Sequence, residues 1–75
     1  MTPDQLEEQL SLHPETSSAA LEYLSHHNQW WIRKNVARHP NTSALTLIKM
    51  FQIGDDAVVV GSIRQRLQNE YGYIL

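Results

Sequence analysis

The residue types best suited to binding another molecule lie close together near the middle of the chain. Trp30 and Trp31 are adjacent, and the cations Arg33, Lys34 and Arg38 follow them. Tryptophan and arginine are enriched among the side chains that dominate the binding energy of protein interfaces. Neighbours on a helix face about 100° apart, so both rings cannot share one core and we expect one at the surface. The opposite interpretation is that both rings pack inside a small domain that is short of core.

The same cations raise a second possibility, which is contact with the phosphates of a nucleic acid. Arg33, Lys34 and Arg38 form one basic cluster, and Arg64 and Arg66 form another. Lysine and arginine side chains that neutralise phosphates supply the sequence-independent part of nucleic-acid affinity. The net charge is only −2, and the chain contains no recognised nucleic-acid motif. Nucleic-acid binding is therefore the alternative to protein binding.

Four histidines, His13, His26, His27 and His39, are candidate metal ligands. Zinc needs three or four ligands around one point, and histidine ligands commonly recur at spacings such as i and i+4. These four residues lack that spacing, and the chain has no cysteine. We expect His13 and His39 to form hydrogen bonds in turns, and the other two to lie at the surface near a helix C-terminus. The sequence predicts neither a metal site nor a cofactor.

No pattern of residues indicates catalysis. The serines lack a nucleophile elbow, and the three glycines do not form a phosphate-binding loop. The paired carboxylates stand at predicted helix starts, where helix capping explains them. A domain this small also leaves little room for a pocket that excludes water. We therefore expect that the protein is not an enzyme.

Length and composition indicate one small domain. A chain of 75 residues buries only about 60% of the surface that its unfolded form exposes. Hydrophobic residues make up 41% of the chain and charged residues 19%, without an apolar run near the roughly 20 residues that cross a bilayer. The first residues lack the basic region and apolar core of a secretory signal. We expect a cytoplasmic protein.

A tetrapeptide that occurs twice in the chain indicates which helices position these side chains. His-Pro-Glu-Thr at residues 13–16 returns 26 residues later as His-Pro-Asn-Thr at residues 39–42, and apolar residues at helical spacing follow each copy. A return at an interval of 20 to 50 residues is typical of solenoids, whose units bury their apolar faces against neighbours. The approximate units are residues 2–27, 28–53 and 54–75, and the two terminal units are degenerate.

About five short helices fit this repeat. Thr2 and Pro3 predict the start of the first helix, and Gln5 would complete a capping box. The first and third helices are expected to end at the two His-Pro pairs, because a residue before proline disfavours the α conformation. Thr16 and Thr42 are the predicted N-caps of the second and fourth helices.

The fifth helix is harder to predict because three consecutive valines begin it. Taken alone they suit a buried strand, but the 26-residue offset places Val58 opposite Ile32 and favours a helix. Gly54 is expected to end the fourth helix, Asp55 or Asp56 to cap the fifth, and a second glycine, at position 72, to end it. We expect the apolar tail that follows to dock on the last helix or to join a second copy. This tail contains Tyr71, Tyr73, Ile74 and Leu75.

The stretch from Trp30 to Thr42, followed by Leu47 and Ile48, resembles the leucine-rich repeat variant family. The family's unit reads roughly Trp-x-Val-Arg-x-x-Val-Ala-x-(Asn or His)-Pro-x-Thr and continues into a leucine-bearing helix. The resemblance implies a right-handed superhelix of short paired helices, with Trp30 in a packing position and Trp31 near the surface. Some members carry an iron–sulfur cluster in a separate cysteine-rich segment, which this chain lacks.

The predicted fold is therefore an all-α, right-handed helical-repeat mini-solenoid of about five short helices. Its predicted function is protein binding, as an adaptor or inhibitor of a larger protein or complex. Two and a half repeats are fewer than the three that such folds usually need for stability, so a homodimer through an exposed repeat end is a second expected arrangement. Such minimal modules are typical of bacterial or phage accessory proteins. The predicted partner-binding residues are Trp31, Arg33, Lys34, Arg38, Tyr71 and Tyr73.

Overall fold

The computed structural model describes residues 1–74, which form five helices joined by short turns. The helices are α1 (Pro3–Leu12), α2 (Ser18–Leu24), α3 (Trp30–Arg38), α4 (Ala44–Ile53) and α5 (Ala57–Tyr71). The described residues contain no β-strand, so the predicted all-α fold of five short helices is confirmed. Leu75, part of the predicted tail, lies outside the described residues.

Several predicted helix ends are confirmed. At the start of α1, the Thr2 hydroxyl accepts the N–H of Gln5, and the Gln5 side chain accepts the N–H of Thr2, which completes the capping box. Asp56 caps α5. Gly54 follows α4 with a φ of 85°, and Gly72 follows α5 with a φ of 69°. These positive φ values explain the two glycines, because other residues adopt such conformations at a cost.

The predicted N-caps of α2 and α4 were wrong by one residue. Ser17 and Ser43 cap these helices, each by accepting a backbone N–H three residues later. The Thr16 and Thr42 hydroxyls instead donate to carbonyls at the C-terminal ends of α1 and α3. Carbonyls in the last turn of a helix lack the regular i+4 donor, so a hydroxyl donor stabilises the end of the helix, and the Val36 carbonyl also accepts the N–H of His39. Threonine therefore closes one helix, and the following serine opens the next.

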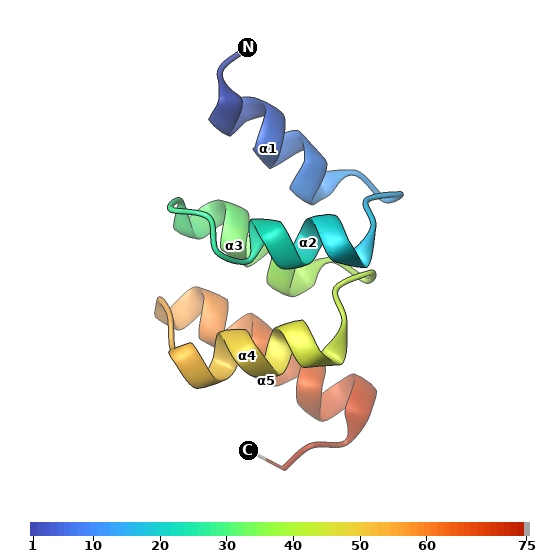
Figure 1. Ribbon diagram of the computed structural model, residues 1–75. Helices are drawn as coiled ribbons and strands as arrows, with labels where there is room; N and C mark the ends of the chain where they lie inside the picture. Colours follow the sequence, from blue (N-terminus) through green and yellow to red (C-terminus); the bar gives the residue numbers. More distant parts are fainter. Residues whose placement is uncertain (75) are drawn as a thin grey trace.

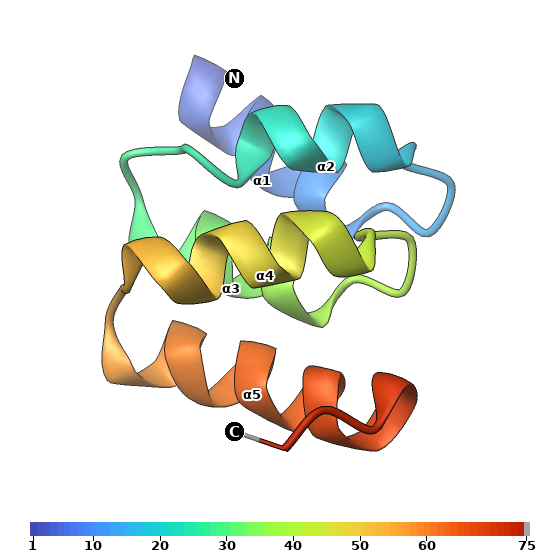
Figure 2. The same cartoon turned by 60° about the horizontal axis from the view of Figure 1, so that its bottom comes forward.

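The helices form two layers, with α2 lying over α3 and α4 over α5 in the view of Figure 1. Figure 2, turned by 60°, shows the layer of α2 and α4 in front of α1 and α3, with α5 below them. α1 lies at one end of the molecule and packs mainly beside α3, and no helix covers it as α2 covers α3. The apolar core lies between the layers and receives no apolar side chain from α1. Its ten buried residues are Leu21, Leu24, Ile32, Val36, Ala37, Leu47, Met50, Val59, Ile63 and Leu67.

The fifth segment is helical, and Ile63 and Leu67 are buried as predicted, but the buried face begins one residue later than predicted. Val59 is fully buried, whereas Val58, predicted to lie opposite Ile32, is half exposed. The N-caps of α3 and α5 are Gln29 and Asp56, which are 27 residues apart. The single extra residue before α5 therefore moves its buried face by one position.

The two His-Pro turns stack directly on each other. The His39 ring accepts the N–H of Asn41 on Nδ1, so its Nε2–H donates to the carbonyl of His13 at 2.7 Å. The Asn41 side chain donates to the carbonyls of Pro14 and Thr16. Side chains of the second turn thus bond to the backbone of the first, which explains why His39 is buried while His13 is exposed.

Arg66 continues this stacking from α5. Its Nη1 donates to the carbonyl of His39 at 2.6 Å, and its Nε pairs with Glu70 at 2.7 Å. The turn after α3 is therefore held on one side by the preceding turn and on the other by α5.

None of the helices in residues 1–74 is long and apolar enough to span a membrane.

Candidate functional site

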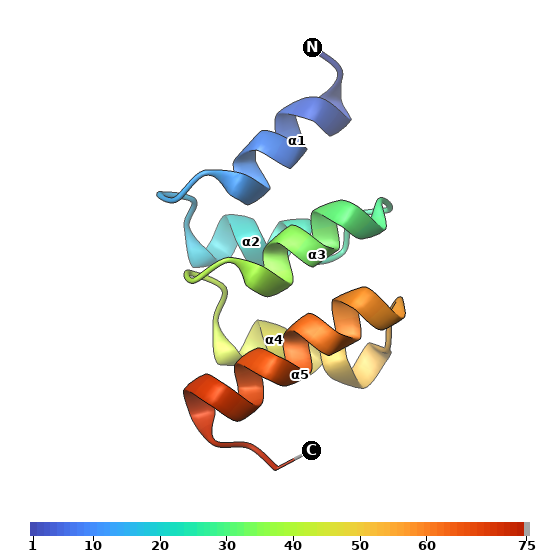
Figure 3. The ribbon, with the colours of Figure 1, turned by 180° about the vertical axis from the view of Figure 1, so that it is seen from behind.

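The outward face of α3 carries the strongest candidate site. Because Ile32 and Val36 point into the core, residues on the opposite side of the helix point away from it. Trp31, Lys34 and Arg38 lie on that side at the spacing i, i+3 and i+7. We call these three residues together with Trp30 the α3 surface. In Figure 3, which views the molecule from behind, α3 lies in the near layer between α1 and α5.

Both tryptophans of the α3 surface are partly exposed. Trp30 is 42% exposed and Trp31 is 36% exposed, so neither ring lies in the core and Trp30 does not take the buried position implied by the family resemblance. Their rings form an edge-to-face pair with centroids 6.2 Å apart. The Lys34 ammonium lies 5.6 Å from the centroid of the Trp30 ring. Large rings held in place on a surface are well suited to bind a partner at low entropic cost.

The cations of the α3 surface have no acidic partner among residues 1–74. Arg33, Lys49 and Arg66 form ion pairs with carboxylates, whereas Lys34 and Arg38 form none. The Arg38 Nε donates to the Ser62 hydroxyl of α5 at 3.2 Å, which orients the side chain without neutralising it. Two uncompensated positive charges therefore lie beside two exposed tryptophans.

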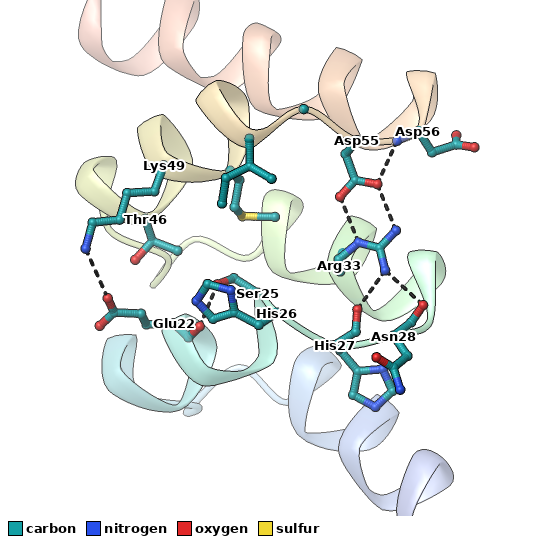
Figure 4. A pocket seen from close by; sticks show the side chains of 13 residues that line it. Glu22, Ser25, His26, His27, Asn28, Arg33, Thr46, Lys49, Asp55 and Asp56 are labelled. Atoms are coloured by element: carbon teal, nitrogen blue, oxygen red, sulfur yellow. Dashed lines mark hydrogen bonds and ion pairs between the residues drawn. The ribbon is translucent and has the colours of Figure 1, made fainter.

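Arg33 was predicted to belong to the same binding surface, but its side chain instead contacts Asp55 and the turn before α3. Its guanidinium binds both carboxylate oxygens of Asp55 at 2.7 and 2.9 Å, and its Nη1 donates to the carbonyls of His27 and Asn28 (Figure 4). The Asp55 side chain is 9% exposed and that of Arg33 is 21% exposed. Arg33 therefore links the turn between α2 and α3 to the turn between α4 and α5, and its donors are not free for a partner.

The Arg33–Asp55 pair changes the proton affinity of both groups. Hydrogen bonds from Arg33 lower the pKa of Asp55 below its ordinary value of 3.8, although burial acts in the opposite direction. The same hydrogen bonds raise the pKa of Arg33. A carboxylate whose pKa is lower in the folded chain stabilises the fold above its unfolded pKa, and this contribution is lost as the pH falls through the folded pKa.

We therefore predict that part of the acid sensitivity of this fold comes from Asp55. Urea unfolding at about pH 5 and about pH 2.5 measures how much stability the wild-type chain loses in acid. Asp55→Asn removes the titrating group, so the variant is less stable at the higher pH but loses less stability between the two. An equal loss in both proteins would show that Asp55 does not contribute.

The remaining predicted partner-binding residues, Tyr71 and Tyr73, lie at the end of α5. Both are half exposed, and their ring centroids are 6.3 Å apart. The N–H of Tyr73 donates to the carbonyl of Leu67, which holds the start of the tail against the last turn of α5. The two tyrosines therefore form a separate exposed group at the end of the molecule opposite to α1.

A cluster of potential metal ligands exists in the described part of the chain, although sequence spacing did not reveal it. The His27 Nε2 lies 3.2 Å from a Glu7 oxygen and 3.5 Å from an Asp4 oxygen. The His27 Nδ1 accepts the N–H of Gln29, so the proton of the neutral ring is on Nε2 and faces the carboxylates. To bind a metal through Nε2, the ring would need its proton on Nδ1, directly against the Gln29 N–H. The geometry thus fits a hydrogen-bonded link between α1 and the start of α3.

A cleft of about 750 Å³ separates the C-terminal halves of α2 and α4 (Figure 4). The Arg33–Asp55 pair lies on one side of it, and an ion pair of 3.5 Å between Glu22 and Lys49 crosses the other. His26 also lines the cleft. Because most of its charged groups are paired with each other, the cleft offers fewer free partners than the α3 surface.

Comparison with protein-family models, curated proteins and solved structures finds no match for this chain. The resemblance to the leucine-rich repeat variant family therefore stays a prediction from the residues at 30–48.

Proposed function

We propose that this protein is a protein-binding module that acts as an adaptor or inhibitor of a larger protein or complex. The observation that carries the proposal is the α3 surface, where two exposed tryptophans lie beside the unpaired cations Lys34 and Arg38. Exposed aromatic rings next to cations are typical of the centres of protein interfaces. The preferred partner segment carries carboxylates and at least one apolar side chain.

The proposal includes the repeat architecture and the cellular location. The two His-Pro turns have the same threonine, serine and histidine hydrogen bonds, which supports a short helical repeat of the leucine-rich repeat variant kind. A right-handed solenoid presents a helix face such as that of α3 to a partner. We propose that the module acts in the cytoplasm.

Nucleic-acid binding is the weaker alternative. In the first predicted basic cluster, Arg33 forms an ion pair with Asp55. In the second, Arg66 forms an ion pair with Glu70 and donates hydrogen bonds to backbone carbonyls. Neither side chain is free to bind a phosphate. Arg64 lies over the ring of Phe51, at 5.8 Å from its centroid. Few cations remain free to follow a phosphate backbone, and affinity for nucleic acids rises with the number of phosphates neutralised.

The test uses charge reversal on the α3 surface with a matched control. Lys34→Glu with Arg38→Glu changes the net charge by the same amount as Lys49→Glu with Arg64→Glu, which alters α4 and α5 instead. We expect nuclease-treated lysate of the source organism to yield a protein retained by the wild type and the control, and reduced about tenfold or more on the α3 variant.

Circular dichroism verifies that all three proteins are folded before the comparison. Retention that disappears from the wild type after nuclease treatment would support the nucleic-acid alternative. Equal retention of the same protein by all three would show that the α3 surface is not the binding site.

A further inference from the structure

A glycine stands inside α5 at a position where nothing within the described chain requires one. Gly61 is exposed and lies within the helix, and unlike Gly54 and Gly72 it has no positive φ. A Cβ atom at position 61 would meet nothing within 4 Å outside its own stretch of helix. Glycine destabilises a helix interior relative to alanine, because ordering it costs more backbone entropy. The close approach of another molecule's backbone is a reason for glycine at such a position.

Gly61 faces outward on the same side of the molecule as the α3 surface. Val59 and Ile63 are fully buried, so Gly61, midway between them along the helix, points away from the core. In Figure 3, α3 and α5 lie side by side in the near layer, so the outward sides of the two helices face the same way. Gly61 therefore extends the α3 surface onto α5.

The Arg38 side chain brings positive charge from α3 to this part of α5. Its Nε donates at 3.2 Å to the hydroxyl of Ser62, the residue that follows Gly61. Its two terminal nitrogens have no acceptor among residues 1–74. Terminal arginine nitrogens bind carboxylates strongly. A carboxylate bound to Arg38 would therefore lie close to Gly61.

The charges of the neighbouring helices favour α5 over α1 as the second contact of an acidic partner. Val58 and Gln65, three residues before and four residues after Gly61, lie on the same side of α5 and carry no charge. The one carboxylate of α5, Glu70, is paired with Arg66. On the other side of α3, α1 carries three carboxylates and no cation. An acidic segment thus meets less repulsion over α3 and α5 than over α3 and α1.

We infer that an acidic peptide segment of the partner lies across α3 and α5, with carboxylates on Lys34 and Arg38 and its main chain against Gly61. This inference rests on the proposed protein-binding function, to which it adds the chemistry of the partner and a second helix. The exposed rings of Trp30 and Trp31 and the half-exposed side chain of Val58 contact the apolar side chains of the segment.

A peptide library displayed on phage supplies the probe. Random peptides are selected on the full chain, and the most enriched sequence is synthesised with a fluorescent label. We expect the enriched peptides to be rich in aspartate and glutamate and to contain an apolar residue. Fluorescence anisotropy then measures the affinity, which should fall as salt screens the opposite charges.

Substitutions at Gly61 separate binding from folding. Gly61→Ala should raise the folding equilibrium constant about two- to fivefold, because alanine is the better helix former, and yet lower the affinity for the peptide. Gly61→Leu should weaken binding about tenfold or more, because the larger side chain keeps the partner backbone away. Gln52→Leu adds the same side chain at an exposed position of α4 and should bind as the wild type. Loss of binding by a more stable variant cannot result from unfolding.

The variant with Lys34→Glu and Arg38→Glu distinguishes failure of this inference from failure of the proposed function. If that variant loses the peptide while Gly61→Leu binds it as the wild type does, the α3 surface binds a partner but α5 takes no part, and the inference is overturned. Equal binding of the peptide by all variants would contradict both proposals. A selection that yields basic peptides, uncharged peptides or no enrichment would overturn the acidic partner.

Discussion

Replacing Arg33 with methionine is expected to lower the free energy of unfolding by about 2–4 kcal/mol. Methionine keeps the apolar stem but removes the donors that bind Asp55 and the carbonyls of His27 and Asn28. The loss is large because a mostly buried carboxylate then keeps only the N–H of Asp56 as a donor, and two carbonyls lose the donor that Arg33 supplies. Urea unfolding at neutral pH, followed by circular dichroism, measures the difference.

Two further variants separate the geometry of this interaction from its charge. Arg33→Lys retains the positive charge but not the planar fork, so it should recover only part of the lost stability. Lys49→Met breaks the half-exposed pair with Glu22 and is expected to cost below about 1 kcal/mol. If Arg33→Met were no more destabilising than Lys49→Met, Arg33 would not hold the two turns together.

The second large effect on the free energy of unfolding is expected at Ile32, which is equivalent to Leu6 under the 26-residue repeat. Ile32→Ala should cost about 2–5 kcal/mol, because it removes three carbons from a fully buried site between α2 and α3. Leu6→Ala should cost about 1 kcal/mol or less, because half of the Leu6 side chain is already in water. Chemical denaturation of both variants measures the two losses.

Comparing the two losses also tests whether the outward face of α1 is exposed in solution. Similar losses at Leu6 and Ile32 would mean that another element covers α1 in solution, either from the same chain or from a second copy. Repeating the Leu6→Ala measurement at low micromolar concentration removes the contribution of a second copy, since weak association is then negligible.

Much of the helical structure could be predicted from local signals. The capping residues Thr2 and Asp56, the His-Pro helix ends and the glycines after α4 and α5 act within a few residues, so their roles can be inferred from the sequence alone. The shift from Thr16 and Thr42 to the following serines had a local signal too, because a serine stands next to each threonine. The N-caps were predicted one residue too early because the threonine, and not the serine, belongs to the repeated tetrapeptide.

The candidate site was less predictable, because its composition depends on partners that are distant in sequence. Arg33 and Asp55 are 22 residues apart, and no local pattern shows that they form a bidentate pair. The single extra residue before α5 likewise moved Val59 into the core. The sequence places Lys34 and Arg38 in the third helix, but only the structure shows that they lack acidic partners among the described residues.

The role of Arg33 affects how the binding surface is tested. A variant that combines changes at Trp31 and Arg33 would alter the fold and the surface together, so a loss of binding would have two explanations. Changes confined to Trp31, Lys34 and Arg38 avoid this problem, because these side chains contribute little to the core.

The most direct test of the proposed function is a photo-crosslinking comparison between two exposed aromatic positions. Benzoylphenylalanine replaces Trp31 on the α3 surface in one protein and Tyr23 on α2, in the opposite layer, in the other. Each is irradiated in nuclease-treated lysate, and the adducts are identified by mass spectrometry. We expect position 31 to form an adduct with one defined protein and position 23 to form none with it. An adduct at position 23 and none at position 31 would contradict binding through the α3 surface.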